Sequence, residues 1–188
     1  MTQIPFHSFG VVLADPPWRY DNWSKRGEWK NAKRHYPTLT DGELIALGRR
    51  INLDFLCAPD CALVMWATFP KLPSAMALMQ AWGFSYRSGG AWGKLLPGGG
   101  AAFGTGYFYR SAAELWLLGV RGSPAVRSHS VRNLILAERR EHSRKPAQMH
   151  EDIERLFDGP YLELFARRAR PGWHCWGDEI ADAGGMVA

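Results

Sequence analysis

Cysteine is scarce in this chain of 188 residues, which contains only Cys57, Cys61 and Cys175. Three thiols cannot all pair, which argues against the disulfide framework of a small secreted domain. Cys57 and Cys61 have a spacing that occurs in zinc sites, but no second Cys or His pair follows at a matching interval. We therefore expect buried thiols, no bound metal, and a reduced, cytoplasmic protein.

Long apolar runs are also lacking. The longest uncharged apolar stretch, from Cys61 to Phe69, is far short of the ~20 residues needed to span a bilayer. No basic head followed by an apolar signal core stands near the N-terminus. The glycines before Lys94 do not have the spacing of a phosphate-binding loop, and Leu95 stands where Ser or Thr would be required. We expect neither membrane attachment nor the chemistry of a P-loop enzyme.

Short apolar runs alternate with segments of helical periodicity along the chain. This pattern predicts a single α/β domain over residues 1–188, doubly wound around a mostly parallel sheet. Strands are expected at 9–14, 61–68, 84–95, 110–122, 161–167 and 172–176, and helices at 41–51, 73–82 and 146–157. Only four residues, 168–171, separate the last two strands, so the usual crossover helix has no room there.

The stretch that most strongly indicates chemistry is Asp15-Pro16-Pro17-Trp18, which directly follows an apolar run. Proline has no N–H and a fixed φ, so the two prolines end the strand. The chain then presents a carboxylate, a Pro16 carbonyl that no local turn easily satisfies, and an indole. These groups suit a planar amine such as the amino group of adenine or cytosine. The alternative is that Asp-Pro-Pro merely terminates a strand.

Positive charge is concentrated directly after this motif. The whole chain carries a formal charge of +5, and the segment from Arg19 to Arg34 has six cations against two acids. The cations are Arg19, Lys25, Arg26, Lys30, Lys33 and Arg34, and Trp23 and Trp29 lie among them. Cations contact phosphates and aromatic rings stack on bases, so this loop predicts a nucleic-acid partner. The alternatives are an ordinary solvated loop or a localisation signal.

Asp15-Pro16-Pro17-Trp18 resembles the catalytic tetrapeptide of the MT-A70 family of S-adenosylmethionine-dependent N6-adenine methyltransferases. Two later segments are similar to family motifs as well: residues 114–122, with the sequence Glu-Leu-Trp-Leu-Leu-Gly-Val-Arg-Gly, and His142-Ser-Arg-Lys-Pro146. The resemblance runs from about Phe9 to Glu179. It implies a Rossmann-like methyltransferase domain in circularly permuted order, with the catalytic motif before the cofactor motif, and S-adenosyl-L-methionine as cofactor.

The resemblance also implies individual roles. Asp15 and the Pro16 carbonyl would each accept an amino hydrogen of adenine, while Pro17 and Trp18 complete the catalytic motif and Trp18 stacks on the base. Tyr36 and Trp66 would border the base, although packing roles are the alternative for both, and residues 96–109 would form a flexible gate. Apart from the resemblance, the charge of the loop predicts that Lys30, Lys33 and Arg34 hold phosphates. The residues expected to contact the cofactor are Asp15, Lys145, Phe165, Arg167, Asp178 and Glu179.

Two of these cofactor contacts also have a physical basis. An ammonium at the N-terminus of a helix favours a carboxylate, which suits Lys145. Acidic residues just beyond a strand hold ribose hydroxyls in nucleotide-binding sheets, which suits Asp178 and Glu179. One departure from the family is Ala147-Gln148, where relatives have an acidic pair.

We therefore expect methyl transfer to the N6 amino group of adenine in nucleic acid. DNA is favoured over RNA, because the chain lacks the additional RNA-binding and partner regions of eukaryotic RNA methyltransferases. An RNA enzyme, a catalytically inert partner subunit and a nucleic-acid-binding domain without enzymatic activity are the alternatives. A protein partner is possible but not required.

Overall fold

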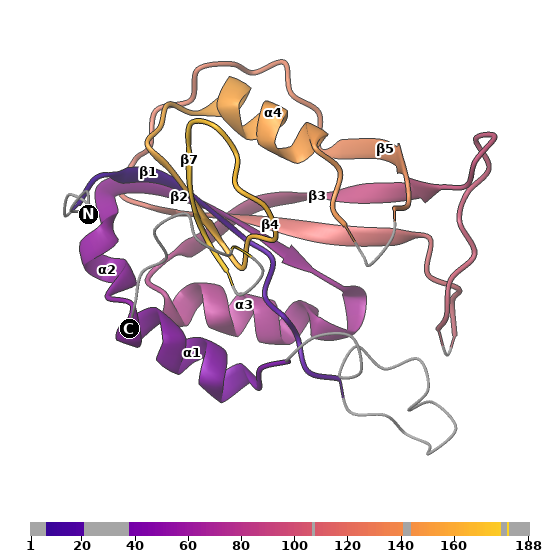
Figure 1. Ribbon diagram of the computed structural model, residues 1–188, viewed down its shortest axis with the longest axis horizontal. Coiled ribbons are helices and arrows are strands. Elements are labelled where there is room, and N and C mark those ends of the chain that lie inside the picture. The colour runs from indigo at the N-terminus through magenta and orange to yellow at the C-terminus, as the bar shows by residue number, and fades with distance from the viewer. Residues whose placement is uncertain (1–6, 21–37, 107, 141–143, 178–179, 181–188) are drawn as a thin grey trace.

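The computed structural model of the chain describes residues 7–20, 38–106, 108–140, 144–177 and 180. Its centre is a seven-stranded sheet in the order β5-β3-β4-β2-β1-β6-β7 (Figure 1). The strands are β1 (Phe9–Ala14), β2 (Cys57–Ala67), β3 (Ser85–Leu95), β4 (Ala113–Arg121), β5 (Leu134–Glu138), β6 (Tyr161–Leu164) and β7 (Trp173–Trp176). Of these described strands, β4 alone runs antiparallel to its neighbours. The predicted α/β domain with a mostly parallel sheet is confirmed.

Helices cover both faces of this sheet (Figure 1). They are α1 (Asp41–Arg50), α2 (Leu53–Leu56), the 3₁₀ turn η3 (Phe69–Lys71), α3 (Leu72–Ala81) and α4 (Gln148–Leu156). On one face, Leu44 of α1 and Leu78 of α3 pack into one buried cluster. On the other face, Met149 and Ile153 of α4 pack into a second. The doubly wound arrangement therefore gives the protein two cores, one on each side of the sheet.

Helix α1 begins where its sequence predicts. The Thr40 hydroxyl accepts a hydrogen bond from the Glu43 N–H at 3.2 Å, and the Glu43 carboxylate accepts one from the Thr40 N–H at 2.7 Å. This reciprocal pair satisfies N–H groups that the first turn of a helix leaves unbonded. Leu44 and Leu47 are buried on the face toward the sheet, as expected.

Several details differ from the sequence prediction. Strand β2 begins at Cys57 instead of residue 61, because Cys57 already pairs with Phe9 ahead of an irregularity in the register. Helix α4 begins at Gln148, two residues after Pro146, which lies in the preceding turn. Strand β5 was not predicted. It lies at the edge of the sheet with only β3 beside it, and of its residues only Ile135 is fully buried.

The link between β6 and β7 contains no helix, yet the two strands are parallel, with Tyr161 opposite Trp173. Glu154 of α4 holds this link in place. Its carboxylate accepts hydrogen bonds from Arg170 Nε at 3.0 Å, Arg170 Nη2 at 3.3 Å and Trp173 Nε1 at 2.7 Å. A half-buried glutamate of α4 thus anchors a connection that has no regular structure of its own.

Within the part of the chain that the structure describes, no helix combines the length and the apolar character needed to cross a bilayer.

Candidate active site

Asp15 lies at the carboxyl edge of the sheet, in the middle of its parallel part. The preceding residue, Ala14, pairs with Met65 of β2 on one side and with Leu164 of β6 on the other. Beyond Asp15 the prolines end the ladder, and the chain turns toward the start of α1. The Asp15 carboxylate therefore lies at the end of β1, between the ends of β2 and β6. Open α/β sheets bind ligands at this carboxyl edge.

The Pro16 carbonyl is not left without a local partner, so that prediction was wrong. The Trp18 N–H donates to it at 2.8 Å, which closes a tight turn within the motif itself. The next residues are tied down as well, since the Leu39 N–H donates to the Pro17 carbonyl at 2.9 Å. A carbonyl oxygen has two lone pairs, so Pro16 retains the capacity to accept a second hydrogen.

Trp18 is part of the core. Only 5% of the residue is exposed, and its indole N–H donates to the Trp66 carbonyl at 3.2 Å. The indole thereby joins the turn after β1 to the end of β2. Its stacking on a base stays a prediction, and it would require the neighbours of the ring to move.

A chain of four charged side chains crosses the carboxyl edge. Lys145 Nζ lies 2.8 Å from Asp15 Oδ2 and 3.4 Å from Glu114 Oε2, and Lys94 Nζ lies 2.7 Å from Glu114 Oε1. The four residues come from the end of β1, the segment before α4, the start of β4 and the end of β3. Charges thus alternate in sign along the chain, so each carboxylate is beside at least one ammonium.

The surroundings shift the two carboxyl groups in opposite directions. Burial raises the pKa of Asp15 above its ordinary value of 3.8, against the attraction of the Lys145 ammonium. Burial also acts to raise the pKa of Glu114, but the ammonium groups of Lys145 and Lys94 outweigh it and hold the pKa below 4.5. Lys145 therefore favours the ionised form of both carboxyl groups, and burial opposes that form more strongly at Asp15 than at Glu114.

Tryptophan rings lie beneath this charged chain. Trp66 is 2% exposed, and its ring meets those of Trp92 and Trp116 edge to face at centroid distances of 6.3 and 5.5 Å. Lys145 Nζ lies 5.6 Å from the centroid of the Trp66 ring. This contact is within the range of a cation–π interaction. The Trp66 ring therefore stabilises the Lys145 ammonium. Its contact with a substrate base stays a prediction.

Phe165 and Arg167 follow β6 at the same edge. Phe165 has a φ of 62°, in the left-handed region that non-glycine residues rarely adopt, and its ring lies 5.9 Å from that of Trp176. Arg167 is close enough for its charge to lower the pKa of Asp15, although burial has the larger, opposite effect. The ends of β1 and β6 and the segment before α4 thus bring together one carboxylate and two cations.

The comparisons with known proteins agree with this geometry. The MT-A70 family model matches residues 9–179. The chain belongs to the MT-A70 family. It is 32% identical to the type II methyltransferase M.MunI of Mycoplasma sp, over 96% of this chain and 81% of that protein. It is 30% identical to the Arabidopsis thaliana N(6)-adenosine-methyltransferase MT-A70-like protein and to the human catalytic subunit METTL3, over 92% of this chain in each case.

The lengths of these MT-A70 proteins differ widely. This chain spans only 24% of the Arabidopsis protein and 28% of human METTL3, against 81% of M.MunI. Residues 9–179, which the family model matches, include all four residues of the charged chain. The chain is thus similar in extent to M.MunI and to one part of the larger proteins.

Several residues assigned from the sequence lie outside the described part of the chain. They are Tyr36, Lys30, Lys33, Arg34, Asp178 and Glu179. Conversely, the sequence assignments omitted Glu114 and Lys94 as members of the site. A glutamate at the head of the otherwise apolar run 114–118 was a signal, because a buried carboxylate requires a charged partner.

The thiols are consistent with the packing role expected of them. Cys57 and Cys61 are free and buried in β2, and Cys175 is half-buried in β7. Over the described residues, no group of three or more His, Cys, Asp or Glu side chains is arranged to hold a metal ion.

Proposed function

We propose that this MT-A70 protein transfers a methyl group from S-adenosyl-L-methionine to the N6 amino group of adenine in nucleic acid, with DNA favoured over RNA. The observation that carries the proposal is the Asp15 carboxylate at the carboxyl edge, held 2.8 Å from the Lys145 ammonium. The preference for DNA is supported by the similarity to the type II methyltransferase M.MunI, which is 32% identical over 96% of this chain and 81% of that protein.

Asp15 and Pro16 would act on the amino group of the base. The carboxylate and the Pro16 carbonyl would each accept a hydrogen bond from the amino group, which draws the nitrogen lone pair out of conjugation with the ring. As the nitrogen gains the methyl group it would release one of its two protons, and the Asp15 carboxylate, its hydrogen-bond partner, would accept that proton. For this the Asp15 carboxyl must be ionised, and the Lys145 ammonium opposes the effect of burial on its pKa. Trp66 and Tyr36 would border the base, and Trp18 would stack on it.

The described residues fit the charged end of the cofactor. Lys145 and Arg167 are cations beside Asp15, which suits the carboxylate of a methionine group. Phe165, next to Trp176, offers an apolar surface, and Asp178 and Glu179 would hold ribose hydroxyls. When bound, S-adenosyl-L-methionine supplies a methyl group on a sulfonium, from which a neutral thioether is a good leaving group. The residues of this chain therefore contribute mainly alignment, worth up to ~7–11 kcal/mol in favourable cases.

The decisive test is the isosteric variant Asp15→Asn. Its amide nitrogen presents donors where the carboxylate accepts, so methylation of an adenine-containing oligonucleotide should fall at least a hundredfold, a typical effect of losing one positioned catalytic group. Cofactor binding by calorimetry should fall much less, because Lys145 and Arg167 remain. Activity above a tenth of the parent value would refute the proposed role of Asp15.

Two further measurements separate the alternatives. Lys145→Ala should weaken cofactor binding more than nucleic-acid binding, whereas equal losses would indicate a structural role. Matched DNA and RNA oligonucleotides, analysed by nucleoside mass spectrometry after reaction, decide the polymer. A clear preference for RNA overturns the choice of DNA, and a parent protein that binds no S-adenosyl-L-methionine is an inert subunit or a binding domain.

A further inference from the structure

The described residues of the connection between β3 and β4, 96–106 and 108–112, form an arm that begins two residues after Lys94 of the charged chain. The Lys94 N–H donates to the Ala112 carbonyl at 2.8 Å, and the Lys94 carbonyl accepts from the Ala102 N–H at 2.7 Å. Farther out, the Gly104 N–H donates to the Ser111 carbonyl at 2.9 Å. These backbone bonds join the two sides of the arm, so its tip, beyond residue 105, is carried away from the sheet. The predicted mobility of this segment as a gate stays a prediction.

The arm exposes aromatic rings to an unusual degree. Phe108 is 98% exposed, Tyr109 91% and Phe103 75%. Rings so exposed contribute almost nothing to the core, and leaving them in water costs the hydrophobic free energy that their burial would provide. A cation lies among them, since Arg110 Cζ is 5.7 Å from the centroid of the Phe103 ring. The tip therefore combines open aromatic faces with a guanidinium.

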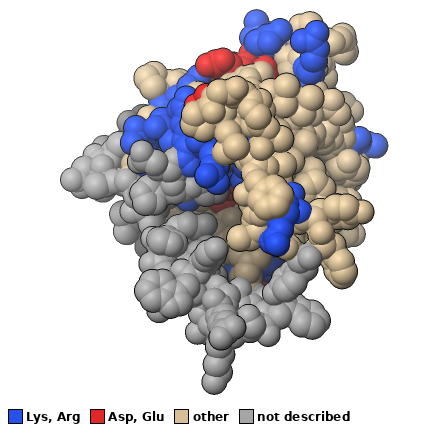
Figure 2. Space-filling view, turned by 90° about the vertical axis from the view of Figure 1, so that its right-hand side faces the viewer, with Lys and Arg blue, Asp and Glu red and all other residues tan. Residues whose placement is uncertain are grey.

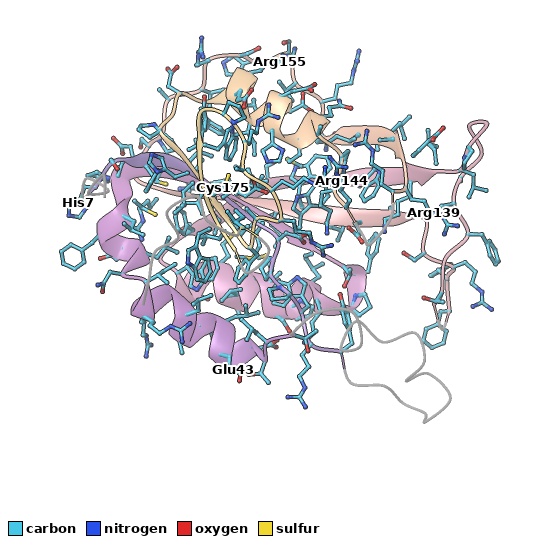
Figure 3. The ribbon with its side chains drawn as sticks, in the orientation of Figure 1. His7, Glu43, Arg139, Arg144, Arg155 and Cys175 are labelled. Atoms are coloured by element: carbon cyan, nitrogen blue, oxygen red, sulfur yellow. The ribbon has the colours of Figure 1, made fainter. Side chains whose placement is uncertain are left out.

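A second basic segment lies beside the root of the arm. The Arg139 N–H donates to the carbonyl of Leu95, the last residue of β3, at 3.1 Å. Between Glu138 and Lys145 the sequence has four cations and two acids, and Arg139, Arg140 and Arg144 are exposed. In Figure 3, Arg139 and Arg144 lie toward the end of the molecule at which β3 and β5 terminate. The basic segment is defined here by its described cations Arg139, Arg140 and Arg144, which stand in the sequence between the arm and Lys145 of the site.

Positive charge is conspicuous on this side of the molecule. Figure 2 faces the end of the molecule to which β3 and the arm extend, and it shows several groups of Lys and Arg side chains there, with acidic side chains only near the upper ones. An excess of cations over acids next to uncovered rings suits a polyanion, whose phosphates contact the cations while its bases stack on the rings.

We propose that the arm and the basic segment together bind an unpaired stretch of the nucleic-acid strand that carries the target adenine. Bases stack on Phe108 and Tyr109, and Arg110, Arg139 and Arg140 contact the phosphates. Because the arm is rooted at Lys94, the strand is led along it to the carboxyl edge where Asp15 lies. This inference rests on the proposed function and deepens it, since it gives the site a surface for single-stranded nucleic acid.

The test is the double variant Phe108→Ala, Tyr109→Ala, measured by anisotropy of a labelled single-stranded DNA of about 12 nucleotides, within the range that single-strand sites cover. Affinity should fall at least tenfold, which corresponds to about 1.4 kcal/mol. Phe108→Trp, Tyr109→Trp should retain it, because the rings remain. The control Tyr86→Ala removes an exposed ring near the opposite end of β3, and it should change nothing. The fold is not at risk, because both deleted rings lie in solvent.

Charge is tested separately with Arg110→Gln, Arg139→Gln, Arg140→Gln. If all three contact phosphates of a single strand, the slope of log affinity against log salt should become flatter by about 2.1, from ~0.7 per phosphate. Cofactor affinity, measured by calorimetry, should not change in either variant. A double variant with parental affinity for the oligonucleotide refutes the surface. So does a change from oligomer to monomer with oligonucleotide affinity unchanged, which would assign the rings to a protein contact.

Failure of this surface differs from failure of the proposed function. In the first case the double variant binds the oligonucleotide and methylates it as the parent does. In the second the parent binds the oligonucleotide through these rings but transfers no methyl group to it, which refutes the methyltransferase assignment and leaves the surface standing.

Discussion

Glu114 should be the most important charged residue for the stability of this domain, and Glu114→Gln tests that expectation. Its side chain is 9% exposed and lies between two ammonium groups, 2.7 Å from Lys94 Nζ and 3.4 Å from Lys145 Nζ. The substitution preserves shape and one hydrogen-bond acceptor but removes the charge. The positive charges of Lys94 and Lys145 are then balanced only by the negative charge of Asp15.

The expected cost follows from the burial of the partners. Removing one member of a buried ion pair typically costs ~3–5 kcal/mol. Lys145 retains Asp15 at 2.8 Å, and the Lys94 side chain is 19% exposed, so water compensates in part. We therefore expect Glu114→Gln to lower the free energy of unfolding by about 2–3 kcal/mol, a large share of the ~5–15 kcal/mol that a domain usually has.

Urea unfolding at pH 7 measures this loss, with Glu138→Gln as the control at an exposed position at the end of β5. The control should change stability by no more than about 0.5 kcal/mol. The pKa of Glu114 is lower in the folded state, so its contribution is present above the unfolded pKa of about 4.5 and is lost as the pH falls through the folded pKa. When the pH is lowered from 7 through this pKa range, the free energy of unfolding should therefore fall less in the variant than in the parent. A loss under about 0.5 kcal/mol at pH 7, or identical acid profiles, would refute this account.

Three other expectations concern separate parts of the chain. Thr40→Ala removes the cap of α1 and should lower stability by about 1 kcal/mol in urea unfolding; no loss would mean that the cap is dispensable. Glu154→Gln loosens the link that carries Phe165 and Arg167, so calorimetry should show weaker cofactor binding with nucleic-acid affinity unchanged, and equal losses would contradict it. Neutralising Lys30, Lys33 and Arg34 together should flatten the salt dependence of duplex binding by about 2.7, from ~0.9 per phosphate, while an unchanged slope would place the duplex elsewhere.

Local features of the fold were predictable from the sequence because they depend on neighbours within a few residues. The capping box of α1 closes between Thr40 and Glu43. The prolines after Asp15 end a strand wherever that strand lies, since they have no N–H to continue the ladder. The motif of the candidate site was found for the same reason, because its carboxylate and its strand-ending prolines are adjacent in the chain.

What the sequence could not decide is what depends on pairing across long distances. The reversed direction of β4 and the edge position of β5 are set by which strands meet in space, and apolar runs look alike in either direction. The partner of Asp15 is Lys145, 130 residues away, and Glu114 is joined to Lys94 across a 20-residue separation that includes the arm. Only the folded sheet brings these charges within hydrogen-bonding distance, because their attraction matters where burial has removed the water that would otherwise screen it.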